Sequence, residues 1–177
     1  MNIQTLTKTA AAILLCGILA ACQTSGLKPG SIQTNYAPSG WTKKSSNGFT
    51  GYVCEVPRCK SDRLIAQGPI KVSGDAEQAI KDGILSRELF NAIANVYNIA
   101  AKDRAKLTIT RRVVKKNYAG FDFSGYFRDR KGRIWITGRF VIQDNRGSVL
   151  VSAARSKSVA NTYFKRYLNQ TTIRRLP

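Results

Sequence analysis

The sequence predicts an α+β domain in which an antiparallel meander sheet of four to six strands packs on one long helix. Two observations carry this prediction. Apolar and polar residues alternate through three long stretches of the C-terminal half, which is the period of half-buried strands, and short turn-forming sequences separate them. Before these stretches, apolar residues recur at helical spacing over residues 75–102, and we expect this single, kinked or split helix to cover the sheet.

The strands follow in order along the chain. Two extended stretches come first, at 48–56 and 62–72, the second interrupted by Gly68-Pro69. Four more are expected at 107–115, 118–128, 133–143 and 148–159. The segments 129–132 and 144–147 both read Asp-X-X-Gly, which predicts two matched hairpin turns with glycine at the position of positive φ.

The sequence indicates where this helix begins and where it can break. Asp75 is a good N-cap, and Gln78 three residues later completes a capping box. Gly83 and Ser86 can kink or split the helix. At the C-terminus, residues 163–168 are expected to form a short helix or strand, and residues 171–177 a frayed basic tail.

The first 22 residues have three parts. A polar start with Lys8 is followed by an apolar run from Ala10 to Leu19, and then by small residues ending at Cys22. This is the layout of a secretory signal peptide, and the run is too short to span a bilayer, which needs about 20 apolar residues. An ordinary signal peptide cut near Ala21, with Cys22 as a bystander, is the simpler alternative.

The four residues Leu19, Ala20, Ala21 and Cys22 resemble the lipobox of bacterial lipoproteins position by position. The resemblance covers only residues 1–22. It implies that residues 1–21 are removed and that Cys22 receives a diacylglycerol and an acyl chain, which anchor the protein to the bacterial envelope. Gln23 follows the cysteine, which in enterobacterial lipoproteins favours the outer membrane.

Residues 22–48 are rich in Gly, Ser, Pro, Asn and Thr and show no hydrophobic period, so we expect a lipidated N-terminus and flexible linker ahead of a basic domain at 49–177. Cys54 and Cys59 are the cysteines left in that domain, and in an exported protein they are expected to form a disulfide. The bridge serves either as a structural staple at a strand end or as a recognition loop that presents Arg58 as an inhibitor does. Two thiols without histidine do not indicate zinc.

Charge is unevenly distributed along the chain. The whole sequence has 29 Lys and Arg against 10 Asp and Glu, and residues 102–177 hold 19 of the basic and 4 of the acidic residues. Such a surface attracts phosphates and carboxylates, which arginine binds in bidentate fashion. The candidate anion-binding residues are Arg111, Arg112, Tyr126, Arg128, Arg133, Trp135, Arg139, Arg155 and Lys157, with Lys115 and Lys116 nearby.

The expected ligands are phospholipid or lipopolysaccharide phosphates or acidic glycans, and a secreted location makes nucleic acid a minor option. A cationic surface that is merely solvated is the alternative. A tethered accessory subunit of an envelope assembly is a further one, with the 54–59 loop, a sheet edge or the basic tail meeting the partner.

An enzyme is not expected. The chain has no histidine, its acids are scattered, and neither a nucleophile elbow nor a phosphate-binding glycine loop is present. Asp122 lies mid-strand among basic residues and is expected to be a salt-bridge partner. The sequence therefore predicts no catalytic site, no cofactor and no metal.

Overall fold

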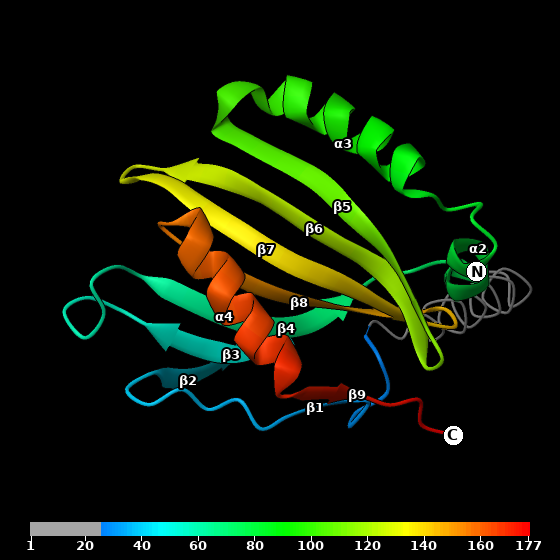
Figure 1. Cartoon of the computed structure of the whole chain (residues 1–177), viewed down its shortest axis with the longest axis horizontal. Helices are drawn as coiled ribbons and strands as arrows, with labels where there is room; N and C mark the ends of the chain where they lie inside the picture. Colours follow the sequence, from blue (N-terminus) through cyan, green and yellow to red (C-terminus); the bar gives the residue numbers. More distant parts are fainter. Residues whose placement is uncertain (1–25) are drawn as a thin grey trace, which may run out of the picture.

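A computed structural model describes residues 26–177, so the expected signal peptide and Cys22 lie outside the described residues. An antiparallel sheet of seven strands, in the order β2-β3-β4-β8-β7-β6-β5, dominates the fold (Figure 1). The strands are β2 (Thr42–Ser46), β3 (Phe49–Cys54), β4 (Arg63–Ile70), β5 (Ala105–Lys115), β6 (Tyr118–Asp129), β7 (Gly132–Gln143) and β8 (Arg146–Ala154). The α+β class is confirmed, but the sheet is larger than the four to six strands expected.

The long strands β5 to β7 lie where alternation places them, β8 ends earlier than expected, and the two hairpin turns differ from each other. The turn after β6 has Gly132 at φ 114°, as expected. In the turn after β7, Asp144 takes the positive φ of 54°, while Gly147 is a strand residue opposite Ile142. A Cβ on Gly147 would come within 2.5 Å of Val72 Cγ2, so that glycine serves close packing instead.

The sheet has two faces, and each carries a separate core. The first face presents Ile109, Phe121, Phe123 and Ile142, which pack with Ile80 from the short helix α2 (Ala76–Lys81). The second face presents Ile65, Val113, Val141 and Leu150, which pack with residues of the C-terminal helix α4 (Lys157–Asn169). Both faces are therefore covered in part, although the sequence predicts a helix on one face only.

The expected helix over 75–102 is two helices. Asp75 caps α2 by accepting a hydrogen bond from the Gln78 amide, as predicted. The Gln78 side chain bonds Asp82 rather than returning to the cap, so the reciprocal half of the capping box does not form. Gly83 has φ 80°, and Ser86 caps the second helix, α3 (Arg87–Ala101), which continues into the 3-10 turn η1 (Lys102–Arg104).

Helix α3 lies along the edge strand β5 instead of over the sheet (Figure 1). Asn91 exchanges two hydrogen bonds with the backbone of Ile109, at 2.9 and 2.8 Å. Asn98 does the same with Leu107, at 2.9 and 2.7 Å. The two amides imitate a neighbouring strand and pair backbone groups that an edge strand otherwise leaves to water.

Helix α4 runs across the second face over β7, β8 and β4 (Figure 1). It buries Ala160, Phe164 and Tyr167, which stand at i, i+4 and i+7. The strand predicted to continue to residue 159 is wrong, because β8 ends at Ala154. The short helix or strand predicted at 163–168 is helical and belongs to this 13-residue helix.

The described part of the expected linker is folded onto the domain. Residues 26–48 contribute β1 (Ile32–Thr34) and β2, and the Tyr36 side chain is only 5% exposed between the rings of Tyr52 and Tyr167. The expected frayed tail forms β9 (Thr171–Ile173), which pairs with β1. Both expectations are corrected, because contacts far apart in sequence order segments that have no periodicity of their own: aromatic packing holds Tyr36, and strand pairing with β1 holds the tail.

The tail is also held by an ion cluster. Arg175 binds the buried Glu77 on α2 and Asp144 in the turn after β7. Burial disfavours the ionised carboxylate, but hydrogen bonds from Lys81, the Asp144 amide and Arg175 outweigh it, so the pKa of Glu77 is lowered. Within residues 26–177, no helix is long and apolar enough to cross a membrane.

Candidate anion-binding site

A pocket of about 310 Å³ lies between helix α4 and strands β5 to β7 on the second face of the sheet; we call it the α4 pocket. The register of the sheet places Arg111, Asp122 and Arg139 side by side on three neighbouring strands, pointing to this face. Helix α4 contributes the opposite wall with side chains one turn apart. The lining is Thr110, Arg111, Asp122, Phe123, Ser124, Thr137, Gly138, Arg139, Lys157, Asn161, Phe164, Lys165 and Leu168.

The floor of the α4 pocket is a buried arginine–carboxylate pair. Arg139 is 9% exposed, and its guanidinium donates to both oxygens of Asp122, at 2.6 and 3.1 Å, and to the Tyr118 hydroxyl at 3.0 Å. Arg111 adds two bonds to the same carboxylate from the solvent side. Burial works against the charge of Arg139, but its bonds to Asp122 prevail and raise its pKa, so it stays cationic. The expected salt-bridge role of Asp122 is thus present in the structure.

The rim of the α4 pocket carries free positive charge. Lys157 and Lys165 are exposed, and among the described residues neither has an acidic group within 4.0 Å. Asn161 lies between them on α4 and accepts a hydrogen bond from the Thr137 hydroxyl of β7. Four cationic side chains therefore surround one carboxylate that is already bound, and the surplus charge faces the opening.

A second group of predicted residues lies at the far end of the β6–β7 hairpin. Arg128 and Arg133 both pair with Asp103 of η1, and the Tyr126 hydroxyl donates to the same carboxylate at 2.8 Å. The hydrogen bond from Tyr126, with the two arginines, lowers the pKa of Asp103, and it raises the pKa of Tyr126 in turn. These arginines are satisfied by a carboxylate and lie outside the α4 pocket.

Trp135 lies between the α4 pocket and the residues around Asp103, and it contacts a side chain of each. Its ring lies 5.3 Å from that of Tyr126, and the Lys157 ammonium stands 5.8 Å from its centre, within cation–π distance. Arg155 donates two hydrogen bonds to the carboxylate of Asp129, at 2.7 and 2.6 Å, and these bonds lower the pKa of Asp129 to about 2. Arg155 is therefore occupied at the hairpin and does not line the pocket.

Arg112 does not join the other candidates. It stands opposite Phe121 in the register, on the first face, and donates to the Ile80 carbonyl at 3.2 Å. Arg111 and Arg112 are consecutive residues of a regular stretch of β5, so their side chains point to opposite faces and cannot act together; a β-bulge between Ile109 and Arg111 sets which of the two reaches the second face. Lys115 and Lys116 are exposed beyond the pocket, where β5 turns into β6.

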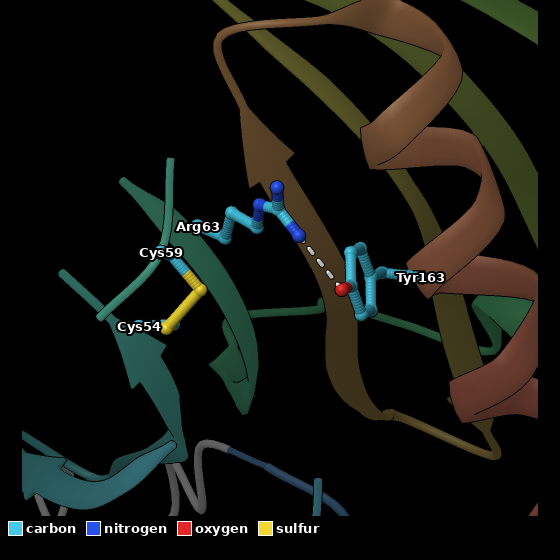
Figure 2. The surroundings of a disulfide bond; sticks show 4 residues. All are labelled: Cys54, Cys59, Arg63 and Tyr163. Atoms are coloured by element: carbon cyan, nitrogen blue, oxygen red, sulfur yellow. Dashed lines mark hydrogen bonds between the residues drawn. A yellow bond between two sulfur atoms is a disulfide. The ribbon is translucent and has the colours of Figure 1, made fainter. Parts of the chain in front are cut away.

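The expected disulfide between Cys54 and Cys59 is confirmed. Cys54 is buried at the end of β3, opposite Arg63 at the start of β4, while Arg58 is exposed in the loop. Figure 2 shows Arg63 beside the bridge and pointing to Tyr163 on α4, to whose hydroxyl it donates at 2.8 Å. The bridge thus closes the loop next to a contact between the sheet and α4, which fits the staple interpretation.

Sequence reasoning found only Lys157 on the α4 side of the pocket, and expected it on a strand. Lys165 and Asn161 were not candidates because residues 160–169 were not expected to be one helix. A signal was present: Lys157, Asn161 and Lys165 stand at i, i+4 and i+8, which is one face of a helix. Within residues 26–177, no three Cys, Asp or Glu side chains gather where they would hold a metal ion.

Comparison with known proteins adds a likeness of fold. No protein-family model matches the chain, and no curated protein sequence does. Among solved structures, the chain is similar to the crystal structure of LpqN, a protein involved in cell envelope biogenesis of Mycobacterium tuberculosis. The TM-score is 0.51 at 16% sequence identity, over 86% of this chain and 90% of LpqN. At this identity the likeness shows a shared fold.

Proposed function

We propose that this protein is an envelope lipoprotein that binds an anionic envelope component in the α4 pocket. The ligand carries a phosphate, as phospholipids and lipopolysaccharide do, or the carboxylate of an acidic glycan. The observation that carries the proposal is the arrangement of charge: Lys157 and Lys165 face the opening without acidic partners, above a floor in which the only carboxylate is bound by two arginines. Likeness of fold to a protein of cell envelope biogenesis supports the location.

The pocket offers binding rather than chemistry. Its carboxylate accepts four hydrogen bonds from two guanidinium groups, three at Oδ2 and one at Oδ1, and so serves as the counter-ion of Arg111 and Arg139. The chain has no histidine to act as a base. We therefore propose a non-enzymatic role, in which arginine and lysine hold an anion and the Trp135 and Tyr126 rings offer a surface for a sugar or lipid headgroup.

Anchoring through acylated Cys22, in the outer membrane, is part of the proposal and has its own test. Mass spectrometry of the protein from its native host should find a diacylglyceryl group on an N-terminal Cys22, and Cys22→Ala should release the protein from the membrane fraction. A mature chain that begins elsewhere or carries an unmodified Cys22 would refute the anchor and leave the pocket untouched.

Anion binding is tested by calorimetric titration of the full chain in a non-ionic detergent with glucosamine 6-phosphate and, separately, galacturonic acid. Lys157→Glu with Lys165→Glu should weaken the preferred ligand by more than about tenfold, since each charge-assisted hydrogen bond is worth roughly 1.5–3 kcal/mol. The matched control, Lys43→Glu with Lys60→Glu, makes the same change of net charge at exposed positions outside the pocket. An equal loss of affinity in both variants would indicate a general cationic surface. If the parent chain binds neither probe, the proposed site is refuted.

A further inference from the structure

Helix α3 exposes an apolar stripe that no part of the described chain covers. Leu89, Ile93, Val96 and Tyr97 are 43, 57, 69 and 53% exposed, in that order. They stand at i, i+4, i+7 and i+8, so they share one side of the helix; we call them the α3 stripe. Single exposed apolar residues are ordinary on a protein surface, but a continuous row of large ones marks a site of contact with a partner or a membrane.

The stripe is held outward by the contacts on the other side of the helix. Asn91 and Asn98 are fixed to the backbone of β5, and Ala94 between them is buried. Phe90 lies 4.7 Å from Phe121 on the first face of the sheet. Rotating α3 to bury the stripe would break four hydrogen bonds to the edge strand, so the exposed orientation is built into the fold.

Charge distinguishes the possible occupants of the stripe. Between Leu89 and Ala101 helix α3 has no charged residue, while Lys102 and Arg104 follow directly in η1 and are exposed. An apolar row ending in cations is the composition of a helix that lies in a membrane interface, with cations at the level of anionic headgroups. A second copy is disfavoured, because the chain has a net charge of +19 and pairing would bring like charges together.

We infer that α3 docks on an anionic phospholipid surface, with the α3 stripe entering about 5–10 Å into the headgroup region and Lys102 and Arg104 among the phosphates. The inference rests on the proposed envelope location, but it uses neither the α4 pocket nor the chemistry of its ligand. A lipid anchor alone tethers a domain that tumbles freely, whereas a second contact through α3 gives the domain one orientation on the bilayer.

The test measures the depth of a spin label on two adjacent residues of α3, one inside the stripe and one outside it, about 100° apart around the helix axis. Val96→Cys places the label in the stripe, and Asn95→Cys, exposed outside the stripe on the same helix, is the matched control. Both are made in a Cys16→Ser background and reconstituted as full chains into vesicles of phosphatidylcholine with phosphatidylglycerol. Accessibility to oxygen, which partitions into lipid, is compared with accessibility to a water-soluble nickel complex.

The label at residue 96 is expected to lose contact with the nickel complex and gain contact with oxygen on anionic vesicles, while the label at residue 95 stays aqueous. Replacing phosphatidylglycerol with phosphatidylcholine should reduce the shift. Aqueous behaviour at both positions would overturn the inference. Spin–spin broadening at residue 96 in the absence of vesicles would also overturn it, because it would show that the stripe docks on a second copy of the chain and not on a bilayer. Labelling the parent chain, which has no added cysteine, reports whether Cys22 is blocked, so a failed anchor is recognised separately.

Discussion

Removing Asp122 should destabilise the fold far more than removing either arginine that binds it. In Asp122→Ala, the buried Arg139 guanidinium keeps only its 3.0 Å bond to Tyr118 and loses its counter-ion. Leaving a buried charge without its partner costs about 3–5 kcal/mol. In Arg139→Met the carboxylate still has Arg111, at 3.0 and 2.6 Å, and the loss should be about 1–2 kcal/mol.

The assay is urea unfolding followed by far-ultraviolet circular dichroism, with the free energy of unfolding compared at constant m-value. For a domain of this size, the loss in Asp122→Ala corresponds to a fall in Tm of roughly 6–20 °C. Lys44→Ala breaks an exposed ion pair with Glu55 and serves as the control, with an expected cost below about 1 kcal/mol.

The double variant Asp122→Ala/Arg139→Met is decisive because it removes both charges. It should be more stable than Asp122→Ala alone, since the stranded guanidinium is gone. If Asp122→Ala costs no more than the Lys44→Ala control, or if adding Arg139→Met lowers stability further, Arg139 is not held as a buried charge and the account of the pocket floor is wrong.

Three more predictions concern other parts of the fold. Because the pKa of Glu77 is lowered on folding, its ionised carboxylate stabilises the fold above the pKa of glutamate in the unfolded chain, near 4.3, and this stabilisation is lost as pH falls through the pKa in the folded chain. Glu77→Gln should therefore lower the free energy of unfolding by about 2 kcal/mol at neutral pH, and the difference between variant and parent should shrink in acid. Burial raises the pKa of Tyr36 to about 12, so Tyr36→Phe should remove amplitude from the late part of an absorbance titration of the phenols, and a variant that loses amplitude near pH 10 instead would contradict the burial of this segment. Asn98→Ala should speed amide hydrogen exchange at Leu107 at a cost of about 1–3 kcal/mol, whereas unchanged exchange would mean that the amide pairing is not what protects the edge.

The strands that could be predicted are those whose pattern is local. In β6, Phe121 and Phe123 alternate with Asp122 and Ser124, so the sequence alone assigns both the strand and its two faces. Strand β2, by contrast, reads Thr-Lys-Lys-Ser-Ser and is exposed throughout. It exists because β3 offers a free edge, which is information that residues 42–46 do not contain.

The position of α3 was not predictable from its stripe. An amphipathic helix next to a half-apolar sheet is expected to lay its apolar side on that sheet. Here Asn91 and Asn98 determine the orientation instead, since two amides that pair with strand backbone outweigh the burial of aliphatic side chains. The seven-residue spacing of Asn91 and Asn98, which places both on one side of the helix, was the overlooked signal.

The candidate site was predicted in half. The strand side was found, since Arg111 and Arg139 belong to a regular meander, whereas Lys157 was the only candidate on the helix side because α4 was not predicted at its full length. The residue types in this segment do not indicate a helix, because β-branched and aromatic residues favour strands; they are Val159, Thr162, Tyr163 and Phe164. Charge counting also could not tell free cations from neutralised ones, because the partner of Arg133 is Asp103, 30 residues earlier in the chain.

The pairing of β1 with β9 has a consequence for how the chain folds. Ile32 finds its strand partner only in Ile173, and Tyr36 is enclosed by a helix that ends at Asn169. The second core therefore cannot close until the chain as far as Ile173 is available, and contacts of such long sequence separation form slowly. A chain truncated before Lys157 would keep the meander and leave the aromatic rings of its first segment in water. Completion of the domain thus depends on residues 157–173, although the meander itself is closed by residue 154.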